Sequence, residues 1–152
     1  MVCMDDPALH EAVRAVHQLF MATSDRVATA LAALGLTYAT ATALWAIDPD
    51  EPPPSMRVLA QRLFCHAPNL SFVAGQLESR GLVQRLVDRA DRRSRTVALT
   101  PEGVQVRAAV ILIILEATPL AALDTPQLRA VVALLEPTLP RDDQEPEEPT
   151  RL

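Results

Sequence analysis

A regular apolar stripe at the start of the chain predicts one long amphipathic helix. Its residues recur at steps of three, four or seven, which places them on one helical face over about seven turns. Gly35 follows the stripe and is expected to end the helix. A helix this long at the start of a small protein often packs against another chain, so residues 1–36 are predicted to serve dimerisation. The stripe consists of Leu9, Val13, Val16, Phe20, Val27, Leu31 and Leu34.

Two shorter helices are predicted next, on either side of an acidic, proline-rich loop. Thr37 can cap a helix that runs to about Ile47, and residues 48–54 then form the loop. Ser55 can cap a short helix whose inward positions are Val58, Leu59 and Leu63.

A turn over residues 64–67 leads to a further helix from about Pro68, since proline is tolerated in a first turn. Gly81 stands where a left-handed cap is expected to end this helix. Its buried face is predicted to hold Leu70, Val73, Ala74 and Leu77.

The pattern then changes to that of strands. Residues 83–87 and 96–99 are short β-rich runs around the charged segment 88–95, which predicts a hairpin with a basic tip. Together with the helices, this predicts a mainly α fold with a small antiparallel wing of two or three strands.

Two helices are predicted after the hairpin, within residues 101–139. The first begins at Thr100-Pro101-Glu102, a good cap and first turn, and is apolar nearly all round over residues 108–115. A surface helix of a monomer would not be apolar all round, so this region is also expected to serve dimerisation. The alternative is that these helices form the core of a monomeric bundle. The second begins at Asp124 and has Leu128, Val131, Val132 and Leu135 on one face. The acidic tail, residues 140–152, is expected to be disordered.

Charge is distributed unevenly along the chain. The net charge is -5 and all 14 basic residues are arginine. Residues 55–107 nevertheless carry nine arginines against four acidic residues, a balance of +5, while the remainder has a balance of -10. One basic segment inside an acidic protein is typical of a surface that faces phosphate, and an ordinary solvated surface is the alternative.

Several classes of protein find no support in the sequence. There is no phosphate loop, nucleophile elbow or Cys/His constellation, so no enzyme activity or cofactor is predicted. Cys3 and Cys65 lie far apart and the three histidines lack ligand spacing, so neither a disulfide nor a metal site is expected. No signal peptide or apolar run of about 20 residues is present, which predicts a soluble, cytoplasmic protein without a membrane partner.

Five short motifs occur in order over residues 35–103. They are Gly35-Leu36-Thr37, Leu59-Ala60-Gln61-Arg62-Leu63, Leu77-Glu78-Ser79-Arg80-Gly81-Leu82-Val83-Gln84-Arg85, Asp88-Arg89-Ala90-Asp91-Arg92-Arg93 and Leu99-Thr100-Pro101-Glu102-Gly103. In their order and spacing they resemble the multiple antibiotic resistance regulator (MarR) family of winged helix-turn-helix proteins.

The resemblance implies a winged helix-turn-helix DNA-binding domain over residues 37–100, between the two dimerisation regions. It implies a sequence-specific regulator of transcription that binds double-stranded DNA, by family default a homodimeric repressor relieved by a small molecule. A winged-helix module that binds protein instead of specific DNA is the alternative, but it predicts a neutral wing. A further alternative is a dimer that does not bind DNA and whose acidic tail recruits a basic partner.

The resemblance also assigns roles in the wing. Arg93 is implied to enter the minor groove, with Asp91 as the carboxylate that orients it. Arg92 and Arg95 are expected to contact phosphates.

On the predicted recognition helix, Asn69, Phe72 and Gln76 line up outward, with Ser71 beside them. Asn and Gln can bond adenine and an apolar ring can meet a thymine methyl, which predicts a palindromic, A/T-containing operator. Packing of Phe72 against the wing or another helix is the alternative. The family usually has a good helix cap where this chain has His66, so a looser helix start is expected.

Family members often bind small aromatic effectors between the dimerisation and DNA-binding parts. Residues that could line such a pocket here are His17, Phe20, Tyr38 and Trp45. The alternative is that these side chains belong to the core. Cys65 is either redox-sensitive or simply buried.

Overall fold

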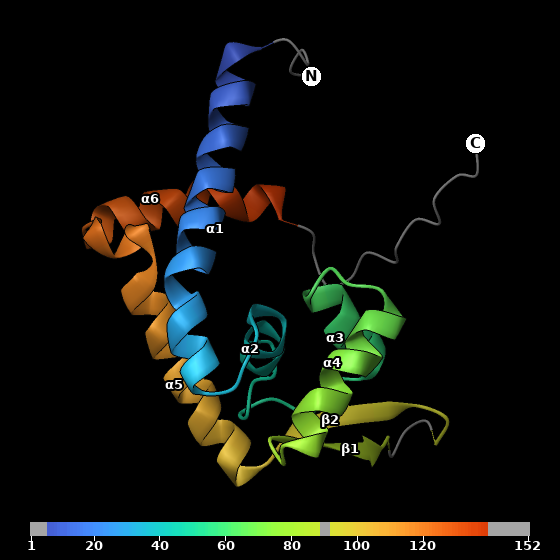
Figure 1. Cartoon of the computed structure of the whole chain (residues 1–152). Helices are drawn as coiled ribbons and strands as arrows, with labels where there is room; N and C mark the ends of the chain where they lie inside the picture. Colours follow the sequence, from blue (N-terminus) through green and yellow to red (C-terminus); the bar gives the residue numbers. More distant parts are fainter. Residues whose placement is uncertain (1–5, 89–91, 140–152) are drawn as a thin grey trace. The chain divides into compact units, whose positions relative to one another are not determined.

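The computed structural model describes residues 6–88 and 92–139, which fall into two compact units divided after Ala122. The first unit contains α1 (Pro7–Ala33), α2 (Tyr38–Trp45), α3 (Met56–Arg62), α4 (Ala67–Ser79), β1 (Val83–Val87), β2 (Arg95–Leu99), α5 (Pro101–Ala117) and the short 3-10 helix η1 (Pro119–Ala122) (Figure 1). The second contains α6 (Thr125–Leu135) and the short 3-10 helix η2 (Glu136–Thr138). The order confirms the predicted mainly α fold with a small wing, and the predicted tail lies outside the described residues.

The residues predicted to cap α2, α3 and α5 form the expected capping hydrogen bonds. Thr37 and Thr40 exchange backbone and hydroxyl hydrogen bonds of 2.9 and 3.2 Å at the start of α2, so two threonines form a complete capping box. The Ser55 hydroxyl accepts from the backbone N–H of Val58 at 3.2 Å, at the start of α3. Before α5, the Thr100 hydroxyl accepts from Gly103 N–H at 3.0 Å. Local sequence therefore determines where each of these helices starts.

Three of the described helices end on a residue in the left-handed region. These residues are Gly35 after α1 (φ 66°), Phe64 after α3 (φ 49°) and Gly81 after α4 (φ 70°). Each is followed by a residue whose N–H reaches back five positions to a carbonyl of the last helical turn, at 2.9–3.1 Å. This is the Schellman motif, in which glycine is usual because it has no Cβ to clash.

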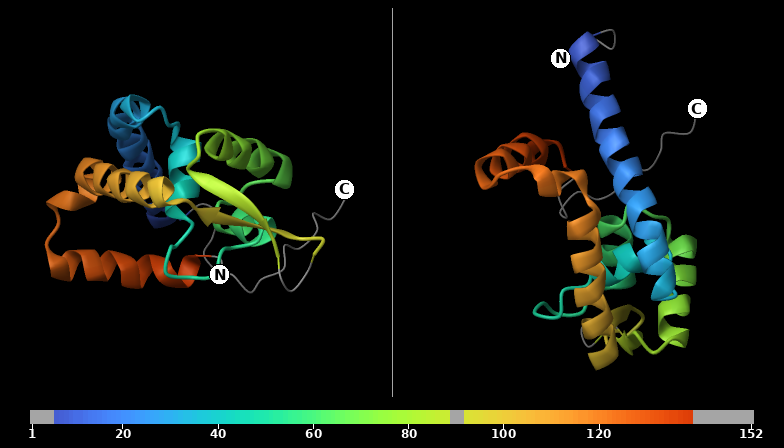
Figure 2. Two further views of the ribbon diagram at one scale, coloured as in Figure 1. Left: turned by 90° about the horizontal axis from the view of Figure 1, so that it is seen from below. Right: turned by 60° about the vertical axis from the view of Figure 1, so that its left-hand side comes forward.

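The wing is an antiparallel hairpin in which Val83 pairs with Leu99 and Val87 with Arg95. An isolated bridge between Ser55 and Thr96 adds a short third segment, so the prediction of two or three strands holds. Figure 2 shows the hairpin beside α4 in the view from below. The wing and the helix-turn-helix therefore belong to one packed body.

The core of the first unit is aliphatic, as the low aromatic content requires. Its largest fully buried side chains are Val27, Leu31, Leu44, Ile47, Leu59, Leu70, Leu77, Leu82, Val83, Val97 and Val110. Gly103 lies so close to the chain of Leu82 that an added Cβ would stand 1.9 Å from the Leu82 carbonyl oxygen. The start of α5 can therefore approach the junction of α4 and β1 only because residue 103 is glycine.

Large apolar side chains remain exposed on both units. On α1 they are Val13, Val16, Phe20 and Met21, each about half exposed, and on α5 they are Leu112 and Leu115. The first half of α1 extends beyond the other elements of its unit (Figures 1 and 2). On α6, taken by itself, Val132 and Leu134 are 60% and 76% exposed. These faces are more apolar than a protein surface in water usually is.

Within residues 6–88 and 92–139, no single helix has the length and hydropathy needed to cross a membrane. Only α1 and α2 taken together reach both, and they are bent by 90° relative to each other.

Candidate nucleic-acid interface

The outer face of α4 carries a row of exposed side chains. Asn69, Ser71, Phe72 and Gln76 are all exposed, while Leu70, Ala74 and Leu77 on the opposite face are buried. The helical spacing therefore separates the two faces as the sequence predicts. Phe72 is 68% exposed, so among the described residues it is not buried against the wing or a neighbouring helix.

The start of α4 differs from the starts of the other helices. His66 occupies the N-cap position, and within the described residues its side chain makes no capping hydrogen bond. The helix begins at Ala67, with Pro68 in its first turn. This confirms that the family's usual cap is missing, so the first backbone N–H groups of α4 are without the partner that a serine or aspartate would supply.

Arg85 connects β1 to the middle of α4 through side-chain hydrogen bonds and an ion pair. Its Nη2 donates to the carbonyl oxygen of Ser71 at 2.9 Å, and its Nε lies 3.5 Å from Oε2 of Glu78. The backbone N–H of Arg85 also donates to Oε1 of Glu78 at 3.2 Å. One arginine and one glutamate thus fix the orientation of the exposed row relative to the wing. Both residues lie in the family motif at residues 77–85, but the motif by itself does not indicate this function.

Arg80 fastens the end of α4 to the end of α1. Its guanidinium donates to the carbonyl oxygens of Leu34, at 2.7 Å, and Gly35. A cation is well placed there because the last carbonyls of a helix carry partial negative charge. The arrangement connects the long N-terminal helix to the helix that would read DNA.

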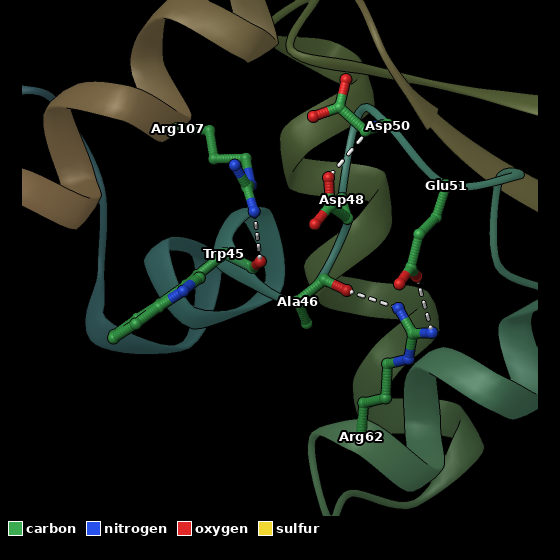
Figure 3. Close-up of polar contacts among 7 residues, drawn as sticks. All are labelled: Trp45, Ala46, Asp48, Asp50, Glu51, Arg62 and Arg107. Atoms are coloured by element: carbon green, nitrogen blue, oxygen red, sulfur yellow. Dashed lines mark hydrogen bonds and ion pairs between the residues drawn. The ribbon is translucent and has the colours of Figure 1, made fainter. Parts of the chain in front are cut away.

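Two further arginines hold the end of α2 (Figure 3). Arg62 donates to the Ala46 carbonyl at 3.0 Å and pairs with Glu51 at 3.1 Å. Arg107, from α5, donates to the Trp45 carbonyl at 3.4 Å. Much of the positive charge of residues 55–107 therefore lies on arginines that bond to backbone carbonyls within the domain.

The arginines at the far end of the hairpin are different. Arg92, Arg93 and Arg95 are exposed, and Arg95 bonds only weakly to the Arg92 carbonyl, at 3.5 Å. Asp91, the predicted orienting carboxylate, lies outside the described residues. The predicted role of the pair thus stays a prediction.

The structure brings together two of the four candidate effector residues. Phe20 and Tyr38 meet edge to face, with ring centroids 5.7 Å apart and an interplanar angle of 90°. Trp45 lies at the other end of α2 and is 40% exposed, and His17 is exposed on α1. Tyr38 also packs against the core, whereas His17, Phe20 and Trp45 are exposed, and the effector role of the four residues stays a prediction.

The described residues offer little support for thiol or metal chemistry. Cys65 is a free, half-buried thiol in the turn before α4. Among residues 6–88 and 92–139, no three His, Cys, Asp or Glu side chains are grouped as a metal site would need.

The fold and the exposed helix with its adjoining hairpin define a winged helix-turn-helix protein. Residues 34–94 match the model of the MarR family. The match covers the winged helix-turn-helix and agrees with the resemblance that the motifs indicated. A search of curated proteins found no match.

Solved structures with the same fold cover nearly the whole chain. A MarR-family transcriptional regulator from Rhodococcus sp. RHA1 is 20% identical, with a TM-score of 0.75 over 88% of this chain and 96% of its own. CouR from Rhodococcus jostii RHA1, bound to p-coumaroyl-CoA, is 20% identical, with a TM-score of 0.72 over 93% and 98%. A mutant MarR from E. coli in complex with operator DNA is 21% identical, with a TM-score of 0.70 over 88% and 96%.

Proposed function

We propose that this protein is a transcription regulator that binds a specific double-stranded DNA sequence as a homodimer. The observation that carries this proposal is the exposed row on α4, which Arg85 holds in a fixed orientation beside the wing. An exposed helix face of amide, hydroxyl and aromatic side chains on a rigid support is suited to reading base edges.

The row has the chemistry to prefer A·T pairs. Asn69 and Gln76 can each form two hydrogen bonds to an adenine in the major groove, and Phe72 can contact a thymine methyl. A good bidentate pair discriminates against the wrong base by about 1–3 kcal/mol. The proposed half-site therefore contains A·T pairs where these three side chains enter the groove.

The wing supplies the contacts outside the major groove. Arg93 enters the narrow, negative minor groove with Asp91 as its orienting partner, and Arg92 and Arg95 bind phosphates. The relative from E. coli that was solved with operator DNA supports a DNA partner for this fold. A protein-binding module would have little use for three exposed arginines at the tip of its wing.

The homodimer uses the apolar faces of α1, α5 and α6. Val13 and Val16 on α1, and Leu112 on α5, are each at least half exposed, which supports burial against a second copy. Two recognition helices about 34 Å apart would read a palindrome over successive major grooves. Each half-site then needs only a few base contacts.

The regulator acts as a repressor that a small aromatic effector releases. The relative bound to p-coumaroyl-CoA shows that this fold can hold an aromatic ligand in another protein. In this chain, His17, Phe20, Tyr38 and Trp45 are proposed to contact the effector. The partly exposed rings of Phe20 and Trp45 support this, since they offer apolar surface that the core does not use.

Selection of duplexes from a random-sequence pool, followed by sequencing, tests the proposed function. The expected product is an inverted repeat with A·T pairs in both halves and a centre-to-centre spacing of about one helical turn. Light scattering should give the mass of two chains at micromolar concentration. Enrichment of no sequence, or a monomer that binds a single half-site, would contradict the proposal.

A further inference from the structure

Phe64 ends α3 in a backbone conformation that favours glycine. Its N–H donates to the Gln61 carbonyl at 3.1 Å, and the N–H of Cys65 donates to the Ala60 carbonyl at 3.1 Å, which completes a Schellman motif. At the equivalent positions of α1 and α4 the chain has glycine. Among the described residues, Phe64 is the only non-glycine with positive φ, at 49°.

The side chain of Phe64 does not offset this backbone strain by being buried in the fold. A Cβ in the left-handed region clashes with the following carbonyl, and an aromatic side chain has no local hydrogen bond to offset the clash. Burial of the ring could compensate, but the ring is 74% exposed. A strained residue whose side chain is left largely exposed among the described residues points to a role in binding.

The position of Phe64 indicates what it would bind. The residue lies in the turn between α3 and α4, two residues before the N-cap His66. Side chains on a helix lean toward its N-terminus, so Asn69 leans toward this turn rather than away from it. Phe64 therefore stands at the N-terminal end of the exposed row that continues through Asn69 to Phe72 on α4.

We propose that Phe64 is a further DNA-contact residue, one that widens the recognition surface beyond α4 itself. The ring would pack on a deoxyribose or a thymine methyl at the edge of the half-site, where it replaces contacts that the uncapped start of α4 does not make. The exposed arginines at the end of the adjoining hairpin favour a polyanion such as DNA over a neutral or basic partner. This inference rests on the proposed function and adds a residue that neither the helix spacing nor the family motifs identify.

Replacement of Phe64 by glycine separates binding from folding, because the two should move in opposite directions. Phe64→Gly removes the ring and the strain together. The expected result is about tenfold weaker binding to the duplex selected by the wild-type chain, measured by fluorescence anisotropy, with an unfolding midpoint in urea equal to or above wild type. Phe64→Asn, which tolerates the left-handed region and keeps the turn less flexible, should lose as much affinity.

Two matched variants complete the test. Phe64→Tyr keeps the ring and the strain and should bind within about twofold of wild type. Gly81→Ala places strain in the same motif at the end of α4, so it should lower the unfolding midpoint and leave binding by the folded protein unchanged.

Wild-type affinity in both Phe64→Gly and Phe64→Asn would overturn this inference and leave the proposed function standing. A loss of affinity that disappears when the protein is concentrated, together with weaker self-association in light scattering, would place Phe64 in the dimer interface and also overturn it. Failure of the wild-type chain to select any duplex would contradict the proposed function, and this inference with it.

Discussion

Arg80 and Arg85, in the body of the winged helix-turn-helix, connect separate elements of the fold, whereas Arg92 and Arg93 lie exposed at the end of the hairpin. Arg80 and Arg85 donate to backbone carbonyls at 2.9 Å or less, on elements distant in sequence. Arg92 and Arg93, at the hairpin end, are exposed. Arginine thus connects elements of the fold in the body of the domain, and it provides exposed positive charge at the end of the hairpin.

This difference changes what the charge of the segment means. A balance of +5 over residues 55–107 suggests one basic surface, but a guanidinium that binds a helix end cannot also bind a phosphate with the same N–H groups. The contacts with DNA should therefore depend on the few arginines of the hairpin end. The body arginines should influence DNA binding through the position of α4.

The largest effect is expected where the body is packed most closely. Gly103→Ala would place a Cβ 1.9 Å from the Leu82 carbonyl oxygen, which neither backbone can avoid without moving. We expect a loss of about 3 kcal/mol or more in the free energy of unfolding, measured in urea. Gly75→Ala is the control, because its Cβ would meet Arg85 at an ordinary 3.6 Å. That variant should be more stable by about 0.5–1 kcal/mol, and equal effects of the two substitutions would refute the packing at Gly103.

The next largest effect is expected for Arg80→Ala. The substitution removes two charge-assisted hydrogen bonds to the end of α1, and their exposure to solvent reduces their value. We expect a loss of about 1–2 kcal/mol in stability, measured by chemical denaturation. Arg57→Ala removes an exposed arginine from α3 and should change stability by less than about 0.5 kcal/mol. An Arg80 variant as stable as the Arg57 variant would show that the bonds to Leu34 and Gly35 contribute nothing.

Arg85→Lys should have a smaller effect on stability and a distinct effect on DNA binding. Lysine keeps the charge but cannot bond to Ser71 and Glu78 with one planar group. The side chains of Arg85 and Glu78 are 31% and 44% exposed, so we expect a loss of about 1 kcal/mol or less. Affinity for the selected duplex should nevertheless fall, because α4 is less well oriented. Anisotropy on the folded variant measures this, and unchanged affinity would remove Arg85 from the recognition surface.

The smallest effect on stability is expected at the hairpin end. Arg92→Ala should change the free energy of unfolding by less than about 0.5 kcal/mol. It should weaken DNA binding similarly for all sequences and reduce the slope of log affinity against log salt by about one, as expected for a phosphate contact.

Arg93→Ala should instead lower affinity for the selected duplex by about tenfold or more, with the dimer intact. The measurement is anisotropy on the selected duplex, with light scattering to verify the dimer. An Arg93 variant with wild-type affinity would remove the wing from the mechanism.

The parts of the fold that follow local rules could be predicted from the sequence. The end of α1 follows from Gly35 and the start of α5 from Thr100 and Pro101, because these signals act within a few residues. The exposed row on α4 follows from helical spacing alone. The loop over residues 64–67 was also predicted, but spacing does not reveal the φ of Phe64, which depends on how α3 ends.

The contacts that orient the site could not be predicted in this way. Arg80 reaches carbonyls 45 and 46 residues away, and periodicity indicates a face but not a partner. Arg85 was part of a quoted motif, yet its bond to Ser71 depends on the packing of β1 against α4. The four effector residues were chosen by type, and only Phe20 and Tyr38 are brought into contact.

The central claim is that this chain binds a specific DNA sequence. Fluorescence anisotropy with the duplex upstream of its own gene, compared with a scrambled duplex of the same composition, tests it most directly at about 50 and about 200 mM salt. We predict that both affinities fall with salt, because phosphate contacts are lost, while the preference for the upstream duplex persists, because base contacts remain. Equal affinity for the two duplexes at both salt concentrations, or binding to neither, would contradict the claim.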